Sequence, residues 1–458
     1  MKKNILSILL LTCVACLQVG CNYEEDVVLN TASSVGNGEE DMAENQTWTS
    51  SLDIVWNGSS ASVSGSVDGV TVTNSNGCVT VTSSASGVVY NVSGSGTGQL
   101  SFYGDPSFQL ALQGLTLTCS NGPAINNQGG TCYVVVNETN TLSDGSTYAS
   151  SSEDRKAAFF SEGQLCFSGS GTLNITGNHQ HALASDDYIR LCTGMTATLN
   201  LTANVNDGMH ANDGIFIEAG TLVVNAKDEC IRTDENAINI TGGTITAISS
   251  QSEAIESKGT ITISGGQIYA QAYDDAINAG GDLTISGGYV CAYATNNDGI
   301  DANGNCYIQG GLVYAIGASS PEVALDANTE EQKTLYVQGG TLVAIGGLES
   351  GASLTQTCYS ASSWSKNTWY ALTVGSEVFA FKTPSSGGTT LVVSGASTPT
   401  LASGVTASGT AVFNGMGYYP ASASGGSSVS LSTYSGGNSG GGPGGGGGPG
   451  GGGGPGGW

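Results

Sequence analysis

The sequence predicts an all-β protein, a right-handed parallel β-helix with about 22–25 residues per coil, followed by a small C-terminal β unit. Gly accounts for 71 of the 458 residues, and charged residues make up only 10%, so the chain lacks the surfaces that helices use. Aromatic residues are scarce at 7%, so a core must be assembled from many small apolar positions, which suits stacked strands. The third observation is an internal repeat that begins near residue 200.

Two landmarks share the period of this repeat. Pairs of glycines follow β-branched runs at Gly242/Gly243, Gly265/Gly266, Gly287/Gly288, Gly310/Gly311 and Gly339/Gly340. An apolar residue follows a small residue or a Cys at Met209, Ile231, Ile255, Ile277, Ile300 and Leu325. Short strands separated by glycine turns fit the corners of a parallel β-helix, because Gly adopts backbone conformations closed to other residues. A β-propeller needs about 40 residues per blade, so the period excludes it.

The N-terminus is typical of an exported lipoprotein. Residues 1–20 begin with Lys2 and Lys3, continue through an apolar run and end at Gly20, directly before Cys21. This pattern predicts a lipoprotein signal peptide with Cys21 as the acylated residue; ordinary secretory cleavage is the alternative. The acidic residues after Cys21 resemble an export signal for the outer face of an outer membrane, although a solvated linker would look similar. We therefore expect a cell-surface-exposed outer membrane lipoprotein.

The rest of the chain divides by composition. We expect an acidic tether over 21–50, the β-helix over 51–350, a C-terminal β cap over 351–434 and a disordered Gly/Pro-rich tail over 435–458. The cysteines of the repeats lie singly in strand-like runs and are interpreted as small apolar fillers. The net charge of −26 disfavours nucleic acid as a partner. A neutral polymer, or an anionic one bridged by metal, remains open.

Several motifs in succession resemble one bacterial family. They are Asn140-Thr141-Leu142-Ser143-Asp144-Gly145, the run from Gly169 through Thr172-Leu173-Asn174-Ile175 to Gly177, and Asp298-Gly299-Ile300-Asp301-Ala302. Together they resemble the carbohydrate-binding domain-containing proteins over roughly residues 50–430. The resemblance implies a parallel β-helix similar in shape to pectate lyases, bound Ca²⁺, and a cellulose- or pectin-like polysaccharide as partner. Where other coils replace Asp-Gly-Ile, as at Asp275-Ala276-Ile277, individual metal sites are in doubt.

Acidic residues accompany the repeating apolar position. Two positions before it stand Asp207, Glu229, Glu253, Asp275 and Asp298. In a stack of coils about 4.8 Å apart these carboxylates repel one another, which bound cations relieve. Ca²⁺ takes 6–8 oxygen ligands, so we predict a calcium site; solvated turn residues are the alternative. The predicted ligands are Glu253, Glu256, Asp274, Asp275, Asn297, Asp298 and Asp301. Arg232 is expected to form a salt bridge with Glu229 and Glu256 in place of a metal.

Tyrosines form a second series of equivalent positions. Tyr269 and Tyr314 share one column and Tyr307 and Tyr336 another, each flanked by inward-pointing apolar residues. Outward aromatic rings on a flat face would stack on sugar rings, which makes these four the predicted carbohydrate-binding residues. The alternative is that they are simply good strand formers.

Three functions fit these features. The first is a surface-anchored, calcium-bearing polysaccharide-binding protein without catalysis. The second is a calcium-dependent, pectate-type lyase, with Lys227, Arg232 or Lys258 as the base that removes a proton. The third is an adhesin or structural stalk, for which the acidic series is surplus. The histidines His179, His181 and His210 are interpreted as coil-face residues, because no further soft ligands lie near them in the sequence.

Overall fold

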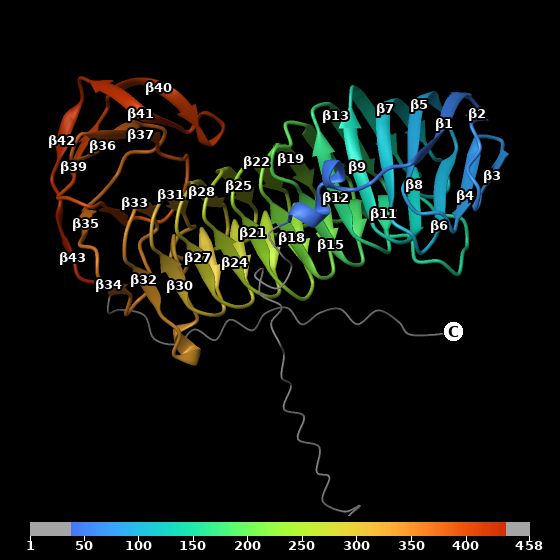
Figure 1. Cartoon of the computed structure of the whole chain (residues 1–458). Coiled ribbons are helices and arrows are strands. Elements are labelled where there is room, and N and C mark those ends of the chain that lie inside the picture. The colour runs from blue at the N-terminus through green and yellow to red at the C-terminus, as the bar shows by residue number, and fades with distance from the viewer. Residues whose placement is uncertain (1–37, 437–458) are drawn as a thin grey trace, which may run out of the picture.

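The structure is a computed structural model that describes residues 38–436. It shows an elongated stack of β coils with a second β unit folded against the C-terminal coils (Figure 1). The predicted signal peptide, Cys21, most of the predicted tether and nearly all of the predicted tail lie outside the described residues. No helix within residues 38–436 is long and apolar enough to cross a membrane.

The coils stack through three parallel ladders of strands. The first ladder is β1 (Ser50–Gly58), β5 (Val88–Thr97), β7 (Phe108–Thr118), β10 (Thr139–Ser143), β13 (Thr172–Gly177), β16 (Thr198–Ala203), β19 (Thr221–Ala226), β22 (Thr244–Ser249), β25 (Gln267–Ala272), β28 (Tyr289–Ala294), β31 (Leu312–Ile316) and β33 (Thr341–Ile345). The second is β9 (Cys132–Asn137), β12 (Leu165–Gly169), β15 (Tyr188–Leu191), β18 (Gly214–Ile217), β21 (Ile238–Ile240), β24 (Ile261–Ile263), β27 (Leu283–Ile285), β30 (Cys306–Ile308), β32 (Leu335–Val337) and β34 (Ser353–Leu354).

The third ladder carries the polar residues discussed below. It is β4 (Cys78–Ser83), β6 (Gln99–Gly104), β8 (Ile125–Gly129), β11 (Ala157–Ser161), β14 (His181–Ser185), β17 (Met209–Ala211), β20 (Ile231–Thr233), β23 (Ile255–Ser257), β26 (Ile277–Ala279) and β29 (Ile300–Ala302). Two antiparallel strands, β2 (Ser60–Ser64) and β3 (Val70–Ser75), flank β1 and β4 at the N-terminal end. The predicted all-β parallel β-helix is therefore confirmed.

The register of the third ladder follows the sequence repeat. Met209 pairs with Ile231, and the series continues through Ile255 and Ile277 to Ile300. All five are fully buried in one continuous core, and burial of each Ile contributes roughly 2 kcal/mol to the stability of the stack. The glycine turns are equally regular: Gly288 has φ 78°, and a Cβ there would lie 2.7 Å from the carbonyl oxygen of Gly265. The buried core and the glycine turns thus both follow the period of the sequence repeat.

The C-terminal unit is antiparallel. Its sheet contains β36 (Trp369–Val374), β37 (Glu377–Lys382), β39 (Thr400–Ser403), β40 (Thr406–Val412), β41 (Gly417–Ser424) and β42 (Ser427–Val429). β38 (Leu391–Ser394) pairs antiparallel with β33 and β35 (Cys358–Ala361), and β35 also pairs with β43 (Ser432–Tyr434). Short 3-10 turns lie at η4 (Thr329–Glu331) and η5 (Phe413–Gly415). Strand β38 closes the last coil, whereas Phe379 and Phe381 of β37 pack beside Tyr314 on the side of the stack.

The first described residues form a strap across the middle of the stack. It contains the 3-10 turns η2 (Glu39–Asp41) and η3 (Ala43–Asn45), and Figure 1 shows it along the outside of the coils. Asp41 pairs with buried Arg190 at 2.9 Å, and Arg190 also contacts Glu218 at 2.8 Å. The sequence placed these residues in the tether; instead they pack against the second ladder.

Candidate functional site

Two columns of polar side chains run along the third ladder, and we call them together the polar ladder. The first column lies two positions before the buried apolar residues and contains His181, Asp207, Glu229, Glu253, Asp275 and Asp298. The second lies one position after them and contains His210, Arg232, Glu256, Asn278, Asp301 and Asp326. From Asp207 onward the first column lies just before the strands and the second column, from His210 to Asp301, lies within them, and side chains of the two columns come close to one another.

The C-terminal end of the polar ladder contains only oxygen ligands. Carboxylate oxygens of Asp298, Asp301 and Asp326 all lie within 4.8 Å of one another. Burial and the neighbouring acids raise the pKa of Asp298 to about 8 and that of Asp301 to about 6, and burial with the charge of Asp298 raises that of Asp326 as well. The Oδ1 atom of Asp326 is buried without a hydrogen-bond partner. This end therefore gathers carboxyl groups that form no ion pair with a Lys, Arg or His side chain among residues 38–436.

Three other predicted ligands, Asp274, Asp275 and Asn297, differ from this group in their hydrogen bonds. Asp275 is buried, and its Oδ1 accepts the backbone N–H of Asp298 at 2.8 Å; burial and the charges of Asp301 and Asp298 raise the pKa of Asp275 to about 9. Asp274 and Asn297 are hydrogen-bonded to each other, and burial raises the pKa of Asp274. Asp326, which was not among the predicted ligands, completes the group at Asp298 and Asp301.

The middle of the polar ladder is neutralised by a cation of the chain itself. Arg232 Nη1 lies 3.1 Å from Glu229 Oε1 and 3.6 Å from Glu256 Oε2, and its Nε lies 3.0 Å from Asp234. Burial acts to lower the pKa of Arg232, but the charges of Glu229 and Glu256 outweigh it and raise the pKa. The predicted salt bridge is confirmed. Glu253 completes an acidic group with Glu229 and Glu256, so two predicted ligands lie beside Arg232.

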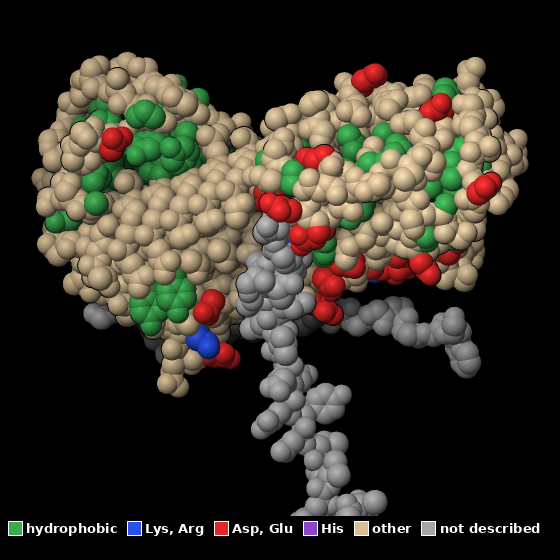
Figure 2. Space-filling model, viewed as in Figure 1, with side chains coloured by type: hydrophobic (Ala, Val, Ile, Leu, Met, Phe, Trp, Pro, Cys, Tyr) green, Lys and Arg blue, Asp and Glu red, His purple; other side chains and the backbone are tan. Residues whose placement is uncertain are grey.

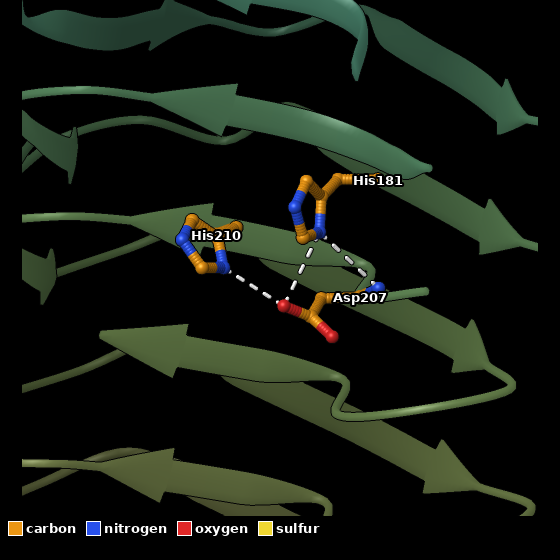
Figure 3. Close-up of side chains that lie close together, drawn as sticks. All are labelled: His181, Asp207 and His210. Atoms are coloured by element: carbon orange, nitrogen blue, oxygen red, sulfur yellow. Dashed lines mark hydrogen bonds and ion pairs between the residues drawn. The ribbon is translucent and has the colours of Figure 1, made fainter. Parts of the chain in front are cut away.

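The N-terminal end differs again, because it contains imidazoles. Figure 3 shows His181 and His210 directed toward the carboxylate of Asp207. The Nδ1 atoms of His181 and His210 lie 3.2 and 2.8 Å from the same oxygen, Asp207 Oδ2, and the two rings stack with centroids 4.3 Å apart. All three residues are buried. His181 and His210 lie on the coil strands β14 and β17 and in addition converge on Asp207; His179 lies apart, stacked on Tyr148.

The four predicted sugar-binding tyrosines fall into two classes. Tyr307 and Tyr336 pair across β30 and β32, with rings 5.0 Å apart and an interplanar angle of 6°. Both are partly exposed, and Figure 2 shows a hydrophobic patch over these strands. Tyr269 and Tyr314 also point out of the coils, but both are buried. The C-terminal unit covers their face, and Tyr314 donates its hydroxyl to the carbonyl of Lys382 at 3.0 Å. The expectation that these two rings are exposed is therefore wrong.

The cysteines behave as packing residues. All nine within residues 38–436 are free thiols, and eight of them are buried. Burial raises the pKa of the Cys132 and Cys291 thiols far above their ordinary value, so they stay protonated and inert. This fits their interpretation as apolar fillers.

Fold and polar ladder together define a parallel β-helix with an acidic, oxygen-rich edge. A family model described as carbohydrate-binding domain-containing protein matches residues 75–320, more than half of the chain. The chain therefore belongs to this family, as the sequence motifs indicated.

The comparison with solved structures gives one similarity to report. A structure described as that of the polysaccharide lyase-like protein from C. thermocellum, in a gadolinium derivative, shares 20% identity with a TM-score of 0.42. The match covers 57% of this chain and 99% of that chain. At this level of similarity it carries no conclusion about the present protein. No curated protein matches the chain.

Proposed function

We propose that this protein is a polysaccharide-binding β-helix that holds Ca²⁺ at the C-terminal end of its polar ladder and has no catalytic activity of its own. The observation that carries the proposal is the convergence of Asp298, Asp301 and Asp326 in a member of a carbohydrate-binding family. Like charges a few ångströms apart are unfavourable in a buried setting unless a cation or protons compensate them.

The residues at this end fit calcium. Ca²⁺ prefers carboxylate, amide and backbone carbonyl oxygens and tolerates irregular geometry. Asp298, Asp301 and Asp326 supply carboxylates, and Asn278 in the same column has a buried Oδ1 without a partner. Within the described chain, no imidazole or thiol belongs to this group, which favours a hard cation over a transition metal. These residues would hold the ion, which would neutralise their charge and offer free positions to a sugar oxygen.

The charge of the chain then separates two modes of polysaccharide binding. With a net charge of −26, the protein repels a polyuronate unless a cation bridges the two carboxylate surfaces. A neutral glucan needs no such bridge and can stack on the Tyr307 and Tyr336 rings, which have small neighbours: Thr284 on one side and Ser353 on the other. Binding of the acidic polymer should therefore depend on Ca²⁺, and binding of the neutral polymer should not.

Two of the three candidate bases, Arg232 and Lys258, are held by carboxylates, which does not support a lyase. A catalytic base must be able to lose its proton, but Arg232 is paired with Glu229, Asp234 and Glu256, and Lys258 Nζ contacts Glu256. The charges of Glu229 and Glu256 raise the pKa of Arg232 and so favour its protonated form. Binding without cleavage is accordingly the function that the described geometry favours.

The test is a binding assay with the detergent-solubilised full chain on cellulose and on polygalacturonate, each with Ca²⁺ and with chelator. We expect both polymers to bind in Ca²⁺ and only cellulose to bind in chelator, with no unsaturated uronate product on long incubation. Failure to bind either polymer in Ca²⁺ would refute the proposed function. Product above a blank, lost in Lys258→Ala or Lys227→Ala, would favour the lyase.

We further propose that the protein is anchored by lipid at Cys21 and faces the outside of the outer membrane. The support is the apolar run that ends at Gly20 before Cys21 and the acidic residues after it. In cells, Cys21→Ser should move the protein from the membrane fraction to the soluble exported fraction. Equal membrane association of the wild type and the variant would contradict the anchor.

A further inference from the structure

The N-terminal end of the polar ladder is a second, chemically distinct group of ligands. We infer that His181, Asp207 and His210 bind a divalent transition-metal ion of the zinc class, separate from any Ca²⁺ at the C-terminal end. Ligand atoms of all three residues lie within 4.8 Å of one another. Two imidazoles and one carboxylate form a ligand set that transition metals favour and that Ca²⁺ does not.

The Nδ1 atom of His181 lies against both a donor and an acceptor of Asp207. His181 Nδ1 lies 3.3 Å from the backbone nitrogen of Asp207, which donates to it, and 3.2 Å from Asp207 Oδ2. In the tautomer in which Nδ1 accepts this N–H, it carries no proton and faces Oδ2 with one lone pair against another. A metal ion shared by Oδ2 and the two Nδ1 atoms turns this repulsion into coordination.

The surroundings of His210 have the arrangement expected around a metal-ligating histidine. Such a residue commonly donates the N–H of its other ring nitrogen to a carboxylate or carbonyl, which fixes the ring orientation. His210 Nε2 lies 3.3 Å from Asp234 Oδ2, which can accept its N–H, whereas His181 Nε2 lies 3.5 Å from Asn206 Nδ2, which is a donor and supplies no such acceptor. The Nδ1 atom of His210, which faces Asp207, is therefore left for the metal.

A fourth ligand is available in the next coil. Glu229 is buried, and its Oε2 has no hydrogen-bond donor among the described residues; the same holds for Asp207 Oδ1. Carboxylate oxygens of Asp207 and Glu229 belong to one group within 4.8 Å. An ion bound by His181, Asp207, His210 and Glu229 would connect three successive coils, and we expect it to stabilise the stack.

The experiment is Zn²⁺ titration of the detergent-solubilised full chain, purified without a histidine tag and with Ca²⁺ in excess to fill the all-oxygen sites. We expect one Zn²⁺ to bind in the wild type and in His179→Asn, the histidine outside the group. The double variant His181→Asn/His210→Asn should lose this binding while its circular dichroism spectrum stays unchanged. Equal Zn²⁺ binding by the double variant, or none by the wild type, would overturn the inference.

Two further measurements keep the test decisive if the double variant does not fold. Co²⁺ added to the wild type should give visible absorption typical of imidazole coordination, and Zn²⁺ but not Ca²⁺ should abolish it. Asp234→Asn should weaken Zn²⁺ binding about 10- to 100-fold, as loss of a partner of a ligating histidine does, whereas Asp213→Asn, an exposed acid in a neighbouring coil, should leave it unchanged. A featureless Co²⁺ spectrum, or equal affinity in both aspartate variants, would contradict the site.

Discussion

The two ends of the polar ladder occupy equivalent backbone positions but contain different chemistry. At the N-terminal end His181 and His210 face Asp207, whereas at the C-terminal end Asp298, Asp301 and Asp326 face one another. Arg232 separates the two ends and supplies its own positive charge to the acids around it. A β-helix thus repeats a position in space, and the residue placed there in each coil decides whether that coil needs a proton, an arginine or a metal ion.

Replacing Arg232, which separates the two ends of the polar ladder, should have the largest effect on stability. Arg232→Ala leaves buried Glu229 without its cation and buried Glu256 with Lys258 alone, and breaking such a pair costs about 3 kcal/mol of unfolding free energy. The loss would also extend the acidic part of the ladder to the group of Glu229, Glu253 and Glu256. We therefore expect Ca²⁺ to restore part of the lost stability in this variant.

The measurement is chemical denaturation in Ca²⁺ and in chelator, with Arg232→Lys as the control that keeps the charge. A variant as stable as the wild type in chelator would show that the arginine does not neutralise the middle of the ladder.

The C-terminal end should account for the calcium dependence of the wild type. A ligand at 100 times its Kd stabilises the folded state by about 2.7 kcal/mol. The triple variant Asp298→Asn/Asp301→Asn/Asp326→Asn removes the charges and should abolish the difference between melting points in Ca²⁺ and in chelator. The matched control is Asp53→Asn/Asp68→Asn/Asp105→Asn, three exposed acids of the N-terminal coils, which should keep the full difference. A triple variant with an unchanged response to Ca²⁺ would place the ion elsewhere.

The stability of the metal-free protein should fall as the pH rises. Burial raises the pKa of Asp275 to about 9 and that of Asp298 to about 8, whereas in the unfolded chain both titrate near pH 4. The folded state then binds more protons than the unfolded state between these values, so stability is full below about pH 4 and is lost as the pH rises through 8 to 9. In chelator the melting temperature should fall across this range, and Ca²⁺ should remove the fall. A melting temperature in chelator that rises from pH 5 to pH 8 would contradict the assignment.

Removing one ring of the Tyr307–Tyr336 pair should give the smallest of these effects, a modest loss of affinity for cellulose. Tyr336→Ala removes one ring of the Tyr307–Tyr336 stack and should weaken cellulose binding about fivefold, which corresponds to about 1 kcal/mol. Tyr273→Ala is the control, because Tyr273 is 51% exposed but lies outside the pair. Equal affinities of the two variants would show that the pair is no sugar platform.

The structural features that depend on the repeat could be predicted from the sequence. The buried series from Met209 to Ile300 and the acids beside it share one period, so both the register and the position of Arg232 between Glu229 and Glu256 could be predicted. The approach of His181 to Asp207 could not be predicted, because His181 lies in an earlier, less regular coil, 26 residues before Asp207, outside the span in which the landmarks repeat.

The covering of Tyr269 and Tyr314 could not be predicted for a different reason. It depends on where the chain after residue 354 returns, and Phe379 and Phe381 reach Tyr314 only through that path. The local pattern correctly indicates that these rings leave the coil, but the covering unit has no period that would show which face it occupies.

The central claim is that the polar ladder selects different cations at its two ends, and anomalous X-ray diffraction tests it most directly. Crystals of the protein grown with Ca²⁺ and Zn²⁺ together, measured on both sides of the zinc absorption edge, distinguish the two ions at each position. We expect zinc between His181, Asp207 and His210, and calcium between Asp298, Asp301 and Asp326. Zinc at the C-terminal end, calcium at the histidines, or no ion at either end would contradict the claim.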